Sequence, residues 1–174
     1  MILILMGVAG AGKSSVGEQL AAQLQWPFYE GDHFHPKSNI LKMCKGVPLS
    51  DEDREPWLRA IREGIVSCLG RKECAIFSCS ALKQRYRDIL AVNNEIKFIY
   101  LYASTKILQE RLQRRSGHFF PLSLLESQRD ALEVPVDALA INTEASLQKI
   151  VDEIIAVINN IMLVGLKNTS GGAL

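Results

Sequence analysis

The sequence predicts an α/β fold, a three-layer sandwich in which helices cover both faces of a five-stranded parallel sheet. Two observations support this prediction. Short apolar runs that fit buried strands alternate, along the whole chain, with segments in which apolar residues recur every three or four positions. The first apolar run also leads directly into a glycine-rich loop, and a strand followed by such a loop and a helix is a common unit of parallel sheets.

Composition indicates one folded domain. The chain has 174 residues, 48% of them hydrophobic, and we expect a domain over residues 1–165 with a flexible tail at 166–174. The formal net charge of +1 gives no basic field, which argues against nucleic acid or a membrane surface as a partner. The cysteines form no C-x-x-C pair, and no targeting or membrane-spanning segment is evident, so we expect a cytoplasmic protein.

Residues 1–79 predict three strands, at 2–6, 28–30 and 75–79. A helix is expected between the glycine-rich loop and Pro27, because apolar residues recur every four positions from Val16 to Leu24. The polar, proline-containing segment 33–56 predicts a loop with a short helix that lies over the sheet. Helical spacing returns at residues 57–69.

The rest of the chain predicts two more strands, at 98–102 and 139–142. Helices are expected at 83–92 and 106–115, and the strongest helical period runs from Leu147 to Ile158. Between the helix at 106–115 and the strand at 139–142, residues 116–135 predict a helical lid, with its helix at about 122–132. In a parallel sheet, ligands bind at the carboxyl ends of the strands, where residues 30–32, 78–83 and 142–144 would meet the glycine-rich loop.

The glycine-rich loop has the spacing G-x-x-x-x-G-K-S, which is typical of a phosphate-binding loop when it follows a strand and opens a helix. Its amides would converge on the phosphates of a nucleoside triphosphate, Lys13 would reach the β- and γ-phosphates, and Ser14 would hold Mg²⁺. The alternative is a strand–helix turn that binds nothing. The expected nucleotide-binding residues are Gly7, Val8, Ala9, Gly10, Ala11, Gly12, Lys13, Ser14 and Ser15.

Acidic and histidine side chains follow the second predicted strand. Asp32 would lie opposite the loop, where a kinase needs a group to orient the acceptor hydroxyl and take its proton. Glu30 could hold Mg²⁺ through water, although both carboxylates could instead cap helices or lie on the surface. His33 and His35 fit substrate hydrogen bonding or a helix entry better than a transition-metal site, because the nucleotide requires Mg²⁺.

Basic side chains provide further candidates. Arg54 lies in an acidic run, where a solvated ion pair is the simple interpretation. Lys83 and Arg87 are four residues apart and would form a basic helix face. A cluster of three arginines before Gly117 could close over the phosphates and stabilise transition-state charge, or simply stabilise a helix C-terminus. The cluster consists of Arg111, Arg114 and Arg115.

Five segments together resemble the substrate region and lid of gluconokinases. They are G-D-H-F-H-P at 31–36, N-I-L-K-M at 39–43, G-V-P-L-S-D-E-D-R-E-P-W-L at 46–58, C-S-A-L-K at 79–83 with Y-R-D at 86–88, and G-H-F-F at 117–120 with Ser127, Gln128, Leu132, Glu133 and Pro135 after it. Each is weak alone, but they occur in the order of the family, and the resemblance covers about residues 1–160. It implies a P-loop kinase, related to shikimate kinases, that phosphorylates D-gluconate with ATP and feeds the pentose phosphate or Entner–Doudoroff routes, commonly as a homodimer.

The resemblance also implies roles for particular residues. Asp32 matches the acidic residue that meets the acceptor hydroxyl, Arg54 suits the gluconate carboxylate, and Arg115 suits a lid arginine near the nucleotide. Lys83 and His118 are implied contacts to hydroxyls or phosphates. The chain departs from the family pattern with Glu30 in place of the usual Asp, with alanines in place of loop serines at 9 and 11, and with Arg129 in place of an aromatic residue.

Other functions remain open to test at this point. The nearest keeps the chemistry but changes the acceptor to shikimate, another sugar acid or a nucleoside monophosphate. A nucleotide-dependent switch is a second alternative, but the sequence has no N-K-x-D-type guanine motif. A purely structural role would not account for Asp32, Arg54 and the predicted lid.

Overall fold

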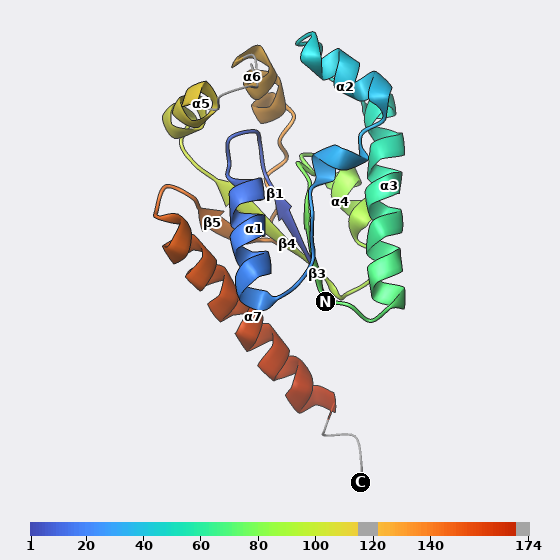
Figure 1. Ribbon diagram of the computed structural model, residues 1–174, viewed down its shortest axis with the longest axis vertical. Coiled ribbons are helices and arrows are strands. Elements are labelled where there is room, and N and C mark those ends of the chain that lie inside the picture. The colour runs from blue at the N-terminus through green and yellow to red at the C-terminus, as the bar shows by residue number, and fades with distance from the viewer. Residues whose placement is uncertain (115–121, 170–174) are drawn as a thin grey trace.

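The computed structural model describes residues 1–114 and 122–169. In these ranges, helices cover both faces of a parallel five-stranded sheet (Figure 1), which confirms the predicted fold class. The elements in order are β1 Ile2–Met6, α1 Lys13–Leu24, β2 Phe28–Tyr29, the 3-10 helix η1 Gly31–Phe34, α2 Lys37–Cys44, α3 Asp51–Gly70, β3 Ala75–Ser78, α4 Gln84–Leu90, β4 Ile96–Tyr102, α5 Thr105–Arg114, α6 Leu122–Asp130, β5 Leu139–Asn142 and α7 Leu147–Thr169.

Alternating residues of the central strand β1 face the two layers of helices. Leu3 and Leu5 pack into a core with α1, α5, α6 and α7. Ile2 and Ile4 pack into a second core with α3 and α4. This alternation follows from strand geometry, in which successive side chains point to opposite faces of the sheet. A continuous apolar run therefore fits β1, because both of its faces are buried.

The strand order β2-β3-β1-β4-β5 places β1 in the middle of the sheet. The chain goes from β1 to β2 and β3 on one side, and later to β4 and β5 on the other. The carboxyl end of β1 is therefore the point where the strand order reverses, which is where such sheets bind ligands. In Figure 1, α2, α5 and α6 gather at this end of the sheet.

The prediction for residues 51–56 was wrong, because α3 begins at Asp51 and includes Pro56. The Ser50 side chain accepts from the Asp53 amide, and the Asp53 side chain accepts from the Ser50 amide, which makes a capping box. Pro56 lies near the helix start, so its missing N–H costs one hydrogen bond while the cap and the buried face of Trp57, Leu58 and Ile61 hold the helix.

The remaining differences concern element ends. β4 begins two residues earlier than predicted, at Ile96. α7 continues to Thr169, so residues 166–169, which we placed in a tail, are helical. Of the predicted lid, residues 122–130 form α6, whereas 116–121 lie outside the described ranges. None of the helices described here is long and apolar enough to cross a membrane.

Replacing the α3 cap tests its contribution to stability. We expect Ser50→Ala to lower the free energy of unfolding by about 1 kcal/mol, because the Asp53 amide loses its acceptor. Urea unfolding followed by circular dichroism measures the change. Ser50→Thr is the matched control, since threonine keeps a hydroxyl acceptor and should remain close to wild type. Equal midpoints for Ser50→Ala and wild type would show that the cap is not needed.

Candidate active site

The glycine-rich loop between β1 and α1 turns through backbone conformations that favour glycine. Gly7, Gly10 and Gly12 have φ angles of 137°, 80° and 96°. A Cβ atom on Gly7 would lie 2.3 Å from the Leu101 carbonyl oxygen, so the end of β1 passes too close to β4 for a side chain. Ala11 is fully buried in the core, which explains how the loop accommodates alanine there. The loop thus has the backbone shape that a phosphate cradle requires.

The Lys13 side chain folds back over this loop. Its Nζ lies 2.9 Å from the Gly7 carbonyl oxygen and 3.0 Å from that of Val8. The ammonium group therefore lies at the mouth of the loop, at the start of α1, where the helix dipole also favours an anion. These residues fit the polyphosphate of a nucleoside triphosphate.

Asp32 lies in η1, just past the carboxyl end of β2, and its neighbour Gly31 is held on both sides. The Gly31 amide donates to Ser78 Oγ at 2.9 Å, and the Trp57 indole donates to the Gly31 carbonyl at 2.7 Å. A Cβ atom on Gly31 would lie 1.9 Å from the Ser78 carbonyl oxygen, so only glycine fits. The exposed Asp32 side chain therefore projects from a fixed backbone.

Cys79 follows β3, which pairs with β1 and β2, the strands that lead to Lys13 and to Asp32. Burial raises the pKa of the Cys79 thiol to about 12, while the Lys13 charge lowers this pKa and the Asp32 charge raises it. The Ser80 carbonyl next to Cys79 also accepts from the Gly7 amide at 3.2 Å. The β3 end thus lies between the phosphate loop and Asp32.

Glu30, the candidate metal residue, accepts a hydrogen bond from the buried Ser78 hydroxyl. Ser78 therefore fixes Glu30 and Gly31 together, since its oxygen also accepts from the Gly31 amide. Among residues 1–114 and 122–169, no group of three or more His, Cys, Asp or Glu side chains could hold a metal ion. The side chains of Ser14 and Glu30 carry oxygen atoms, the ligand type that Mg²⁺ prefers, and a protein-bound Mg²⁺ keeps several waters.

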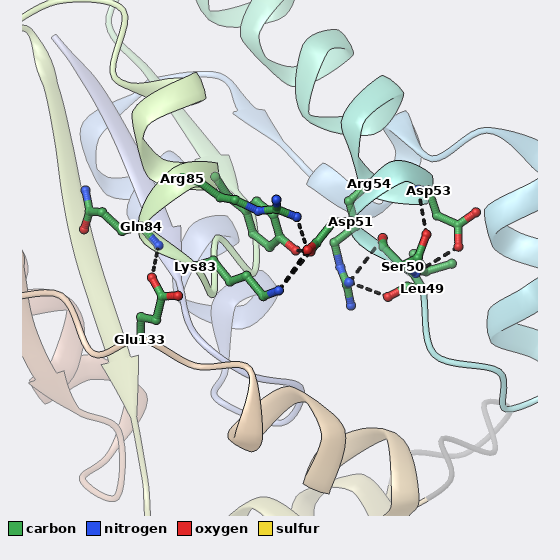
Figure 2. Close-up of polar contacts among 10 residues, drawn as sticks. Leu49, Ser50, Asp51, Asp53, Arg54, Lys83, Gln84, Arg85 and Glu133 are labelled. Carbon is green, nitrogen blue, oxygen red and sulfur yellow. Dashed lines mark hydrogen bonds and ion pairs between the residues drawn. The ribbon is translucent and has the colours of Figure 1, made fainter.

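Three cationic side chains gather around the Tyr86 ring, where α3 and the start of α4 meet. Figure 2 shows these three side chains, Arg54, Lys83 and Arg85. The Arg54 guanidinium and Lys83 Nζ each lie 5.9 Å from the ring centroid, and the Arg85 guanidinium lies 5.3 Å from it. We call Arg54, Lys83, Arg85 and Tyr86, together with Asp51, the Tyr86 cluster. Its three cations and one carboxylate leave an excess of positive charge, which suits an anionic ligand.

Asp51 is the centre of the Tyr86 cluster and was missed by the sequence analysis. Both of its oxygens lie 3.0 Å from Lys83 Nζ, and it also accepts from the Tyr86 hydroxyl and pairs with Arg85. The residues S-D-E-D at 50–53, which match a capping box, were the signal that could have placed Asp51 at a helix start. Its pairing with residues of α4 had no signal in the sequence.

The predicted basic face of Lys83 and Arg87 was wrong. Arg87 is only 4% exposed and donates to the carbonyls of Ala81 and Leu82 at 3.1 and 3.2 Å. Burial lowers the pKa of its guanidinium. Arg87 therefore stabilises the turn that carries Lys83, and it forms no exposed basic face with Lys83.

Of the arginines at the end of α5, Arg111 lies beside the phosphate loop. Its Nη1 donates to Thr143 Oγ1 at 3.0 Å and to the Gly10 carbonyl at 3.3 Å, which joins the loop to the segment after β5. Arg114 is 84% exposed, with Glu110 at 3.9 Å. Arg115 and His118 lie outside the described residues.

The helix α6 contacts the phosphate loop through Gln128, a residue to which the sequence analysis gave no role. The Ala9 amide donates to Gln128 Oε1 at 2.7 Å. After α6, the Glu133 amide donates to the Leu82 carbonyl at 2.9 Å, and its carboxylate accepts from the Gln84 amide at 2.6 Å (Figure 2). This part of the predicted lid is therefore tied to the loop and to α4.

Comparisons with known proteins agree with this architecture. Residues 9–159 match the shikimate kinase family. The chain is 40% identical over 162 residues to the thermoresistant gluconokinase of Escherichia coli, covering 90% of this chain and 93% of that protein. It is 46% identical over 136 residues to the gluconokinase of Gluconobacter oxydans, covering 78% and 76% of the two chains.

Solved structures give the same result. A gluconokinase from Sinorhizobium meliloti 1021 has a TM-score of 0.83 at 44% identity, with 91% of each chain covered. The shikimate kinase of Aquifex aeolicus has a TM-score of 0.57 at 18% identity, over 94% of this chain and 99% of the other, and shares the fold. With a phosphate loop, the cations of the Tyr86 cluster and these relatives along most of its length, the chain belongs to the gluconokinase family of P-loop kinases.

Proposed function

We propose that the chain transfers the γ-phosphoryl group of ATP to the primary hydroxyl of D-gluconate, giving 6-phospho-D-gluconate and ADP. The observation that carries this proposal is the meeting of three features at the carboxyl ends of the strands. The phosphate loop follows β1, Asp32 follows β2, and the Tyr86 cluster flanks the turn after β3. The gluconokinase relatives favour gluconate over a shikimate-like acceptor.

The loop amides and Lys13 hold the phosphates, and Arg111 supports the loop through the Gly10 carbonyl. Ser14 and Glu30 would hold Mg²⁺, which offsets the charge that develops on the phosphate oxygens. The hydroxyl oxygen of the acceptor forms a bond to the γ-phosphorus while the bond to the β–γ bridging oxygen breaks, and Asp32 takes the hydroxyl proton. Positioning and electrostatics supply most of the rate enhancement.

The carboxylate of gluconate fits the Tyr86 cluster. Nη1 of Arg54 donates to the Leu49 and Ser50 carbonyls, which leaves Nε and Nη2 as a planar fork that would bind a carboxylate in a bidentate manner. Lys83 adds positive charge nearby, while His35, stacked on Trp57, would bind a hydroxyl between the two ends of the acceptor. Arg115 and His118 would complete the site from the lid, which excludes water as it closes.

We further propose that the enzyme acts in the cytoplasm as a homodimer and supplies 6-phosphogluconate to the pentose phosphate pathway. These proposals rest on the membership of the chain in the gluconokinase family. Size-exclusion chromatography with light scattering tests the oligomeric state, and a mass corresponding to one 19.4 kDa chain would contradict it.

A coupled assay of ADP release tests the proposed reaction. We expect gluconate to stimulate ADP release strongly in the presence of Mg²⁺, and shikimate, nucleoside monophosphates and other aldonic acids to stimulate it much less. Mass spectrometry should find one phosphoryl group added to gluconate. Stimulation by another acceptor, without stimulation by gluconate, would overturn the substrate assignment.

Arg54→Lys tests the carboxylate contact. Lysine keeps the charge but loses the fork, so we expect the KM for gluconate to rise by at least about tenfold while the KM for ATP stays near wild type. Steady-state kinetics with each substrate varied in turn measure both constants. Arg59→Lys is the matched control, because Arg59 lies on the same helix but pairs with Glu55 at the surface. An unchanged KM for gluconate in Arg54→Lys would remove Arg54 from the site.

A further inference from the structure

The orientation of the Asn39 side chain in α2 is fixed by its neighbours. Asn39 is 2% exposed, and the nitrogen of its amide lies 2.7 Å from the Asp53 carbonyl oxygen. A carbonyl can only accept, so the nitrogen and not the oxygen of the Asn39 amide must face it. The capping box in turn holds Asp53 at the start of α3.

The same nitrogen determines where the proton of His35 lies. Asn39 Nδ2 is 3.3 Å from His35 Nδ1, and an amide nitrogen has two protons and no acceptor capacity. With one proton directed at the Asp53 carbonyl, the second faces His35 Nδ1, which must therefore present its lone pair. A neutral imidazole with a lone pair on Nδ1 has its proton on Nε2.

The surroundings of His35 also keep its ring neutral and fix the orientation of the ring. The ring stacks on Trp57 with centroids 4.3 Å apart and planes at 12°, and Trp57 is itself 2% exposed and bonded to Gly31. Burial lowers the pKa of His35 to about 4, with Arg54 lowering it further and Asp32 acting in the opposite direction. In the described part of the chain, His35 Nε2 has no hydrogen-bond partner.

We propose that Asn39 is a positioning residue, which fixes His35 as the Nε2–H tautomer and so makes His35 a permanent hydrogen-bond donor to an oxygen of the acceptor. The acceptor's identity as a polyol acid rests on the proposed function. Asp32 accepts at one hydroxyl, Arg54 holds the carboxylate, and His35 donates to an oxygen between them. This arrangement selects an acceptor with an oxygen at that position, because an analogue that lacks it leaves the N–H unpaired.

Nitrogen-15 NMR of the histidine side chains tests the tautomer in the full-length protein without substrate. In wild type we expect His35 Nδ1 to have the shift of an unprotonated nitrogen and Nε2 that of a protonated one, unchanged between pH 7.5 and 5.5. His35→Gln assigns the signals, because the chain has only three histidines. A proton on Nδ1, or a charged ring at pH 7.5, would overturn the proposal, whatever the substrate assay shows.

Asn39→Asp tests the positioning role. Aspartate offers only acceptors to the ring, so we expect His35 to bind a proton at Nδ1 and the KM for gluconate to rise about tenfold with little change in the KM for ATP. Ser38→Asp adds the same charge at an exposed position of α2 and should match wild type.

A double-mutant cycle separates positioning from a merely structural role. The amide of glutamine always has an N–H donor, so a glutamine at position 35 does not depend on Asn39. We therefore expect Asn39→Leu to raise the KM for gluconate when position 35 is histidine, and to leave this KM unchanged in a His35→Gln background. Equal effects of Asn39→Leu in both backgrounds would overturn the proposal. If gluconate fails as the acceptor while the tautomer is as expected, the proposed function fails and the assignment of the ring proton stands.

Discussion

Replacing Lys13 with alanine should reduce kcat by at least about 10³-fold, because the phosphate oxygens lose their one ammonium partner in the loop as negative charge develops. In the structure, Nζ lies at the mouth of the loop, within 3.0 Å of the Gly7 and Val8 carbonyl oxygens. Coupled ADP-release kinetics at saturating gluconate measure kcat.

Two further measurements make the result for Lys13→Ala specific. Lys13→Met, which keeps the apolar stem, should be equally inactive, and both variants should keep the far-UV circular dichroism of wild type. Lys106→Ala removes an exposed lysine from α5 and should leave kcat near wild type. Full activity in either Lys13 variant would contradict the role of Lys13 at the phosphates.

Asp32→Asn should lower kcat by about 10²- to 10⁴-fold, the usual contribution of a positioned general base. The change keeps the size of the side chain but removes its ability to take the hydroxyl proton. The backbone should stay in place, since Gly31 is held by Ser78 and Trp57. We therefore expect the KM values for ATP and gluconate to change little, which steady-state kinetics can measure.

Asp152→Asn is the matched control for Asp32→Asn. Asp152 is an exposed residue of α7, where it accepts from Gln148, and the same chemical change there should leave kcat unaltered. If Asp32→Asn retained wild-type kcat, another group would have to take the hydroxyl proton, and Asp32 would have no role in catalysis.

Much of the fold could be predicted from the sequence because the pattern of apolar residues follows strand and helix geometry. All five strands and the lengths of β1 and β5 follow from short apolar runs. The start of α3 could not be predicted in the same way. Pro56 suggested a loop, and the capping box of Ser50 and Asp53 outweighed it once Trp57 and Ile61 were buried.

The candidate site shows a similar division. The phosphate loop and Asp32 follow from local spacing next to a strand, which is why motif reasoning finds them. Arg87 is buried and Lys83 joins the Tyr86 cluster because of the side of α4 that packs against the sheet. Two lysine or arginine residues four positions apart share a helix face only if the helix includes both, and Lys83 precedes the first residue of α4.

The sequence by itself determined the layers of the fold, the phosphate loop and the membership in the gluconokinase family, because these depend on short-range spacing and on segments in a fixed order. Only the tertiary structure placed Asp51 between Lys83 and Tyr86, Gln128 on the Ala9 amide, and Asn39 between His35 and Asp53. These contacts join different elements, and which polar groups meet there is decided when the buried faces of α2, α3, α4 and α6 pack together.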